Sequence, residues 1–291
     1  MKKKQNVLST IILTCLFLVG LSVMLYPTIS DWWNSKVQSR AIASYSEALT
    51  EIDNSHYEEL LAGADGYNKR LLVVDSPFVN YDDVGGYDAA LDISGTGIMG
   101  YITIPQINVE LPIYHGTGEA VLNIAVGHLE GTSLPVGGAN THCVLSAHRG
   151  LPSARLFTDL DQLVVGDTFT ITVLDEVLTY EVEQILIVLP HEMEKLAILP
   201  GRDIVTLMTC TPYGVNTHRL LLRSRRVDTV VERTVRVSAD AVQMDPLLVV
   251  PLISAPLVLL LLCFWTFSGR KRRDIPYRNP LYHLPDRKDD D

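Results

Sequence analysis

One cysteine of the chain is followed, across a short loop, by an arginine. The stretch reads TLMTCTPYGVNTHRL, with Cys210 at the end of an apolar run and Arg219 after the loop. If the run is a strand and the loop returns the chain beside it, the thiol and the guanidinium become neighbours. A guanidinium that stays charged can stabilise a thiolate, or bind a substrate carbonyl or an oxyanion. This spacing suits a nucleophilic cysteine, although free cysteine is also among the most buried core residues.

Acyl transfer by a thiol also needs a group that protonates the leaving amine. His148 ends the apolar run THCVLSAH and precedes RGLP, which places it at a strand end comparable to that of Cys210. His218 is the local rival, but it adjoins Arg219 and would point to the other face of a regular strand. By the same alternation, Cys143 faces away from whatever His148 faces. Spacing alone leaves both histidines as candidates.

Two other uses of the cysteines are compatible with the sequence. Cys143 and Cys210 could form one disulfide. A zinc site would combine His142, Cys143, His148 and Cys210, but the paired CxxC spacing typical of zinc ligands is absent from the sequence. A calcium loop of the D-x-D-x-D-G kind is absent as well. We therefore expect no metal and no cofactor.

The segment that carries these residues reads as strands. Seven short runs are rich in Val, Ile, Leu, Thr and Tyr and are bounded by Gly, Pro, Asn or Asp, a pattern that predicts a β-sandwich or barrel. They are residues 98–105, 109–115, 141–148, 168–174, 178–189, 203–210 and 219–227. One helix is expected at 153–163, where Leu156, Phe157, Leu160 and Leu163 form an apolar stripe.

The residues before the strands have helical periodicity. Between residues 27 and 70, apolar side chains recur near helical spacing with charges between them, which predicts two helices broken near Asp53. The second helix is expected to end near Gly63 to Gly66. Residues 71–96 contain Pro and paired Gly without a sustained period, and are predicted to be an extended loop.

Two uncharged apolar segments, residues 7–26 and 247–268, match the length of a membrane span. Lys2 to Lys4 precede the first and Arg270 to Arg273 follow the second, so the positive-inside rule places both termini in the cytoplasm. A cleavable signal peptide is the alternative for residues 7–26, but the apolar run is longer than a signal core. Trp32 and Trp33 then fit an interfacial aromatic belt.

The part between the two segments is acidic. Residues 27–246 hold 14 Lys and Arg against 29 Asp and Glu, a formal net charge of −15. Nucleic acid requires a basic footprint, so this charge argues against a nucleic-acid partner. An acidic exterior suits a basic partner, although it is usually a device for solubility.

Two longer stretches resemble a known family. TLMTCTPYGVNTHRLLLRSRR is similar to the TLxTC…R signature of sortases, the Gram-positive cysteine transpeptidases, and GTSLPVGGANTHCVLSAHRGLP resembles their strand that ends in the catalytic histidine. The sequence of these stretches is most similar to class C, the pilin-polymerising branch. The similarity to sortases extends over about residues 97 to 227. The resemblance implies a mainly β, closed barrel of about eight strands. It also implies that His148, Cys210 and Arg219 are catalytic; SAHRG replaces the SGHRG common in class C.

Class C sortases carry a loop upstream of the barrel whose Asp-Pro-aromatic motif covers the active site. The nearest match here is DSPF, in which Ser76 separates Asp75 from Pro77 and Phe78. The resemblance implies that the acidic residue reaches the arginine and the ring covers the thiol. The insertion of Ser76 puts both contacts in question, and an ordinary extended linker is the alternative.

The resemblance implies a function and a membrane topology. Cys210 attacks the Thr–Gly carbonyl of an LPXTG-like sorting signal, and the thioacyl enzyme is resolved by a lysine amine of a pilin subunit. The catalytic domain lies outside the cell membrane. The alternatives are a wall-anchoring sortase, a thiol peptidase, or a membrane-tethered adhesion barrel without catalysis. The expected segments are 1–6 cytoplasmic, 7–26 membrane, 27–70 helical, 71–96 lid or linker, 97–236 barrel, 247–268 membrane and 269–291 cytoplasmic.

Overall fold

The computed structural model describes residues 2–229 together with residues 254, 256 and 258. The chain divides into two compact units, Met1–Thr234 and Val235–Asp291, and the first contains the elements described below. Of the second predicted membrane segment, only those three isolated residues are described. Residues 230–236 at the end of the predicted barrel domain and the tail 269–291 lie outside the described residues.

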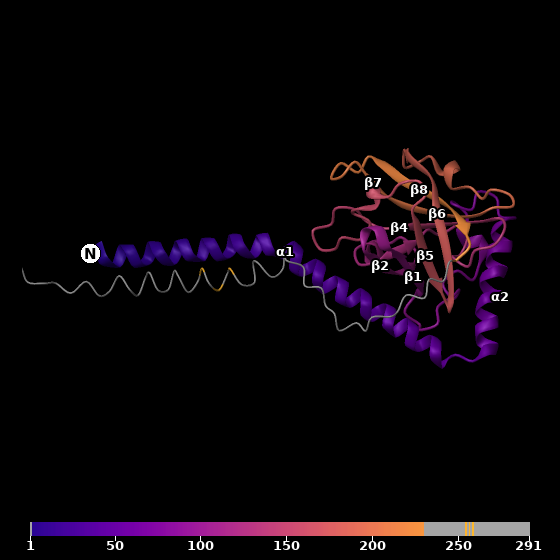
Figure 1. Ribbon diagram of the computed structural model, residues 1–291, viewed down its shortest axis with the longest axis horizontal. Helices are drawn as coiled ribbons and strands as arrows, with labels where there is room; N and C mark the ends of the chain where they lie inside the picture. The colour runs from indigo at the N-terminus through magenta and orange to yellow at the C-terminus, as the bar shows by residue number, and fades with distance from the viewer. Residues whose placement is uncertain (1, 230–253, 255, 257, 259–291) are drawn as a thin grey trace, which may run out of the picture. The chain divides into compact units, whose positions relative to one another are not determined.

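Eight strands form a closed barrel in the order β1-β2-β3-β4-β7-β8-β6-β5 (Figure 1). The predicted mainly β barrel is therefore confirmed. The strands are β1 (Ile98–Ile104), β2 (Val109–His115), β3 (Val126–His128), β4 (Thr141–Ser146), β5 (Thr168–Val173), β6 (Glu176–Val188), β7 (Asp203–Thr211) and β8 (His218–Val227). The sequence did not predict β3, which has only three residues. It fills the place between β2 and β4.

The barrel closes where β1 pairs with β5. Gly100 lies in β1 at the end of a register shift against β2. A Cβ at this position would overlap the backbone carbonyl of Thr172 in β5 and come within 3.1 Å of the Val173 side chain. Glycine thus permits the close backbone approach that barrel closure requires.

The N-terminal helices are α1 (Lys2–Glu51) and α2 (Asn54–Leu71). The predicted break is confirmed, because the Asp53 side chain caps α2 by accepting a 2.8 Å hydrogen bond from the His56 amide. The predicted end near Gly63 to Gly66 is wrong. Ala64, Tyr67 and Leu71 are buried at helical spacing against the barrel core, and this packing outweighs the weak helix propensity of glycine.

The first predicted membrane segment, residues 7–26, lies within α1. The apolar window of this helix has a mean hydropathy of 2.1 and is not buried within the protein. Among the described residues, α1 is the helix long and apolar enough to cross a membrane. The helix continues from this segment to Glu51 without interruption, although Pro27 lies inside it.

The helix predicted at 153–163 is wrong. This region contains turns and one short 3₁₀ helix, η3 (Leu160–Gln162). Leu156 has a φ of 42°, which interrupts a right-handed helix, and the Phe157 amide donates to the distant His148 carbonyl. The apolar stripe is nevertheless buried. Its residues therefore reach the core from a series of turns, in which local i to i−3 hydrogen bonds are combined with the longer-range bond from Phe157 to His148.

Residues 71–96 are mostly turns, as expected of a loop, with one 3₁₀ helix, η1 (Tyr81–Val84). Tyr87 anchors the second half of this loop. Its hydroxyl lies 2.9 Å from Nδ1 of the buried His128 in β3 and accepts a hydrogen bond from the Gly116 amide. The loop is therefore attached to the barrel at a specific point.

We expect the fold to lose stability below neutral pH because two histidines are buried without charge. Burial lowers the pKa of His128 and of His142 to about 4, below the ordinary value of 6.5. The unfolded chain binds these protons as the pH falls below 6.5, whereas the folded chain binds them only near pH 4. The stabilising effect of the two uncharged histidines is thus complete above pH 6.5. At pH 4.5 the free energy of unfolding should be lower by about 2 kcal/mol for each histidine.

Thermal unfolding followed by circular dichroism at pH 7.5 and 4.5 measures this loss. The midpoint should fall by about 10 °C for the two histidines together. In His142→Gln the side chain cannot titrate, so the pH-dependent fall should shrink. An equal fall in the variant and the parent would contradict the assignment.

Candidate active site

The strand register places Cys210 directly beside Arg219. β7 and β8 are antiparallel, and Cys210 is the partner of Arg219 in their ladder. The next pair is Thr211 with His218, so His218 lies on the opposite face from Cys210. The predicted pairing of Cys210 with Arg219 across the two strands is confirmed, and the local rival His218 belongs to the other face of β8.

Parallel pairing of β4 with β7 brings His148 to the same end of the barrel. Ser146 pairs with Met208, and two further bonds extend the contact: the Ala147 amide donates to Met208, and the Thr209 hydroxyl donates to Ala147. Two steps beyond the Ser146–Met208 pair, the residues are His148 and Cys210. His148 thus follows the paired part of β4, at the end of the barrel where β7 carries Cys210.

Cys210 and Arg219 belong to the outer face of the barrel wall. Alternate residues of β4, β7 and β8 contribute to the barrel core, including Leu145, Leu207 and Leu220. The residues between them, Val144, Met208 and Leu221, belong to a smaller apolar cluster. Cys210 and Arg219 share the alternation of the second set, whereas His148 follows the end of β4.

The two cysteines of the barrel differ in environment. Cys210 is partly exposed, whereas Cys143 is buried in the barrel core, and both are free thiols. Burial raises the pKa of the Cys143 thiol well above its ordinary value, so this cysteine is held in its unreactive form. The structure excludes a disulfide between them and leaves Cys210 as the accessible one of the two thiols.

The zinc alternative fails on geometry. His142 is fully buried, with Nδ1 2.9 Å from the Ala197 carbonyl and Nε2 2.7 Å from the Thr206 hydroxyl. Both ring nitrogens are thus occupied by hydrogen bonds. Its neighbour Cys143 faces the opposite side of β4. The two residues cannot ligate one ion together.

Arg219 has only weak partners in this structure. Its Nη1 donates to the carbonyls of Asn216 and His218 at 3.3 and 3.2 Å, near the upper limit of a hydrogen bond. Neither acceptor is charged, and Arg219 takes part in no ion pair with the described acidic residues. Its guanidinium can therefore turn to a substrate at little energetic cost.

The DSPF segment reaches the barrel through its second half. Phe78 packs against the outer apolar cluster to which Met208 also contributes, two residues before Cys210. Gly131 has a φ of 77°, and a Cβ there would overlap the Pro77 carbonyl group and come within 3.2 Å of Phe78 Cα. The backbone of Pro77 and Phe78 thus lies directly on the turn after β3.

The acidic residue of this segment does not reach the arginine. Asp75 is exposed, and the salt bridges of the described residues include none between Asp75 and Arg219. Ser76, the inserted residue, has a φ of 53°, and its carbonyl accepts the amides of Val79 and Asn80. The insertion forms a turn that seats Phe78 while Asp75 stays in solvent.

Contacts that the sequence did not indicate link the loop after His148 to the loop after Cys210. Tyr213, three residues after Cys210, lies under the Arg149 guanidinium at 5.9 Å from the ring centroid. A Cβ on Gly150 would come within 2.8 Å of the same ring. Arg149 and Gly150 are the two residues that follow His148. The sequence alone does not relate Arg149 and Gly150 to Tyr213, because the two stretches meet only in the folded structure.

Comparison with known proteins agrees with this geometry. Residues 102–227 match the sortase domain family. The crystal structure of sortase C1 from Streptococcus agalactiae is 49% identical over 66% of this chain and 100% of that chain, with a TM-score of 0.61. The sortase C-1 structure from Streptococcus pneumoniae is 42% identical over 66% and 100%, with a TM-score of 0.59.

Among curated proteins, sortase A of Streptococcus agalactiae is 32% identical over 39% of this chain and 47% of that protein, so the match spans about half the length of that relative. The chain belongs to the sortase family, the cysteine transpeptidases. Its structural neighbours are class C sortases. Sortases are membrane-associated enzymes with an extracellular catalytic domain, and the apolar N-terminal part of α1 fits that arrangement.

Proposed function

We propose that this chain is a pilin-polymerising transpeptidase. Cys210 attacks the carbonyl between Thr and Gly of an LPXTG-like sorting signal, and His148 protonates the departing amine. Arg219 holds the substrate carbonyl and the oxyanion. The resulting thioester is resolved by the lysine amine of a pilin subunit, which restores the thiol. The observation that supports this proposal is the register of β7 with β8, which pairs Cys210 with Arg219, together with the parallel pairing of β4 with β7, whose last pair, Ser146 and Met208, lies two residues before His148 and Cys210.

Each role follows from the chemistry of the residue and its position. A thiol at a strand end that is partly exposed can meet a peptide from outside. The guanidinium beside it carries a fixed positive charge where negative charge develops on the carbonyl oxygen. The acidic exterior of residues 27–246 favours encounter with a lysine-bearing acceptor. Metal ions are not needed for any of these steps.

Intact mass spectrometry tests the proposal directly. The purified chain is incubated with an LPXTG-type peptide, with and without a lysine amine acceptor, beside Cys210→Ala. We expect an adduct on Cys210 that lacks everything after the threonine and that the amine discharges. Discharge by water alone would indicate a peptidase. Discharge by a cell-wall peptide amine and not by lysine would indicate a wall-anchoring sortase, and the absence of any adduct would favour a binding barrel.

The DSPF segment is proposed to be a lid that slows access to Cys210 through Phe78. Its seat is the outer apolar cluster and the backbone at Gly131. A solved structure of the Streptococcus agalactiae sortase C1 is described as that of a lid mutant. The lid of this chain depends on apolar cover, because Asp75 makes no ion pair with Arg219 among the described residues.

We expect Phe78→Ala to speed the reaction of Cys210 with a methanethiosulfonate reagent about tenfold, because apolar cover over the thiol is removed. Asp75→Ala should leave the rate within twofold. Val79→Ala is the matched control, since Val79 is 76% exposed and adjoins Phe78. The rate is measured by stopped reaction and mass spectrometry. If Asp75→Ala accelerated the reaction as much as Phe78→Ala, cover by the ring alone would be the wrong explanation.

A further inference from the structure

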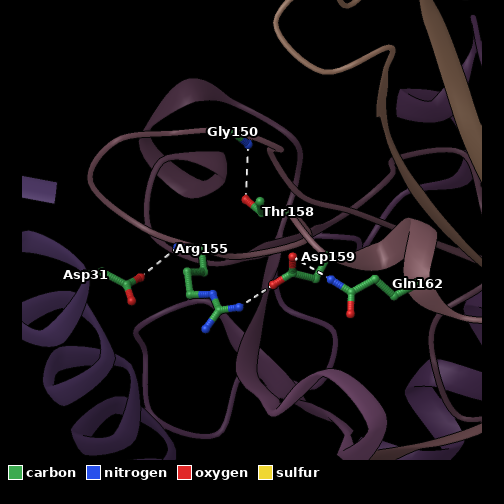
Figure 2. A network of polar contacts seen from close by, with 6 residues as sticks. All are labelled: Asp31, Gly150, Arg155, Thr158, Asp159 and Gln162. Atoms are coloured by element: carbon green, nitrogen blue, oxygen red, sulfur yellow. Dashed lines mark hydrogen bonds and ion pairs between the residues drawn. The ribbon is translucent and has the colours of Figure 1, made fainter. Parts of the chain in front are cut away.

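The loop that carries His148 rests on the helix that begins in the apolar N-terminal segment. Asp31 of α1 accepts a 2.7 Å hydrogen bond from the Arg155 amide. Asn34, one turn further along α1, donates at 2.7 Å to the Ser153 carbonyl. Figure 2 shows the Asp31 carboxylate directed at the Arg155 main chain, while the Arg155 side chain turns to Asp159. The helix thus holds the loop by its backbone.

One hydrogen bond connects this contact to His148 itself, and a second connects it to Gly150, two residues further on. The Phe157 amide, two residues after Arg155, donates to the His148 carbonyl at 3.1 Å. The Gly150 amide donates to the Thr158 hydroxyl at the same distance, as Figure 2 also shows. Leu156 between them is buried and has a φ of 42°, so the turn has little freedom to adjust. A displacement at Arg155 would therefore move the backbone of His148.

The helix is itself fixed to the barrel, so it can serve as a reference for the loop. Tyr45 is 1% exposed; its hydroxyl donates to the Met99 carbonyl at 3.0 Å and accepts from the Leu174 amide at 2.8 Å. Gln38, between Tyr45 and Asn34, donates to the Ile124 carbonyl at 2.7 Å. These residues follow one face of α1 at helical spacing. Only Asp31 and Asn34 contact the His148 loop in these hydrogen bonds.

We propose that Asp31 and Asn34 are positioning residues, which hold the His148 loop so that the imidazole stands beside Cys210. This inference rests on the proposed function. It goes beyond that function in assigning to α1 a part in positioning the active site. Both residues act through the backbone at Ser153 and Arg155 and touch no reacting atom. A displacement of a catalytic group by about 1 Å can lower the turnover rate by about 100-fold. The two contacts thus affect turnover more than substrate binding.

The test uses the full chain in detergent micelles and compares Asp31→Ala/Asn34→Ala with the parent. We expect kcat for transfer of an LPXTG-type peptide to fall about 10- to 100-fold while KM stays within twofold. Gln38→Ala is the matched control, because it loses a bond of equal length to a loop that does not carry His148; its kcat should stay within twofold. Asp31→Asn keeps an acceptor oxygen and should retain most of the parental kcat.

Hydrogen–deuterium exchange of the peptide covering residues 149–158 gives a readout that does not depend on activity. Exchange in this peptide should be at least tenfold faster in the double variant and unchanged in Gln38→Ala. Unchanged exchange in the double variant would overturn the inference, even if the parent transferred no peptide and the proposed function had failed. Faster exchange with an unaltered kcat would overturn it as well.

Discussion

Replacing Cys210 by alanine is expected to reduce transfer by about 10⁴-fold or more, because the residue forms the covalent intermediate. No mass adduct with the peptide should form. Replacing His148 by alanine should lower kcat by about 10²- to 10⁴-fold, the usual contribution of a general acid. The thiol is still present in that variant, so a slow adduct should remain detectable. Single-turnover kinetics followed by mass spectrometry separates the two outcomes.

Cys143→Ala provides the control for the loss of a thiol. Cys143 lies on β4 in the barrel core, and its side chain faces away from His148. Its removal should leave kcat within about twofold and lower stability by about 1 kcal/mol, as a small core truncation does. If Cys143→Ala lost transfer while Cys210→Ala retained it, the nucleophile would be Cys143 on β4 and not Cys210 on β7.

The sequence contained enough to predict the pair Cys210 and Arg219, because both lie on consecutive strands joined by a short loop. Local alternation then determines which side chains share a face. The sequence could not determine that His148 comes to the same end of the barrel as this pair. That proximity arises from parallel pairing of β4 with β7, strands that are separated by about 60 residues of sequence, as the pair Ser146 and Met208 illustrates. Only the family resemblance identified this histidine in advance.

The errors of the sequence analysis have a common cause. The apolar stripe at Leu156, Phe157, Leu160 and Leu163 fits a helix, yet the segment is a series of turns in which the Arg155 and Phe157 amides bond to Asp31 and to the His148 carbonyl. The two glycines of α2 favoured an early end, yet buried Tyr67 and Leu71 extend the helix. In both cases tertiary contacts decide between local conformations of similar energy. Local patterns do not record such contacts.

The sequence analysis did not single out the polar residues of α1 either, because their role also depends on tertiary contacts. Asp31 and Asn34 look like ordinary surface residues next to a membrane segment, since a hydrogen bond to a backbone group demands no particular partner side chain. The lid is an intermediate case. The DSPF motif was visible, but the turn at Ser76 that separates the positions of Asp75 and Phe78 was not.

Replacing Arg219 by lysine is expected to lower kcat by about 10²- to 10³-fold, the effect of removing one donor to an oxyanion. A lysine keeps the charge but offers no planar pair of donors, so it should not restore the rate. Stability should hardly change, because the native bonds of Arg219 to Asn216 and His218 are long and the acceptors are uncharged. Steady-state kinetics and thermal unfolding of the same preparation measure both quantities.

Arg223 is the matched control on the same strand and the same face. Its guanidinium donates to Gln184 at 3.1 Å and to the Lys195 carbonyl at 2.5 Å, so its role is to hold neighbouring elements together. Arg223→Ala should therefore lower the thermal midpoint while kcat of the folded enzyme stays within a fewfold. The two substitutions should thus affect different quantities: Arg219→Lys should lower kcat, and Arg223→Ala should lower the thermal midpoint. A large stability loss in Arg219→Lys with an unaltered kcat would mean that this guanidinium supports the loop and does not contact the substrate.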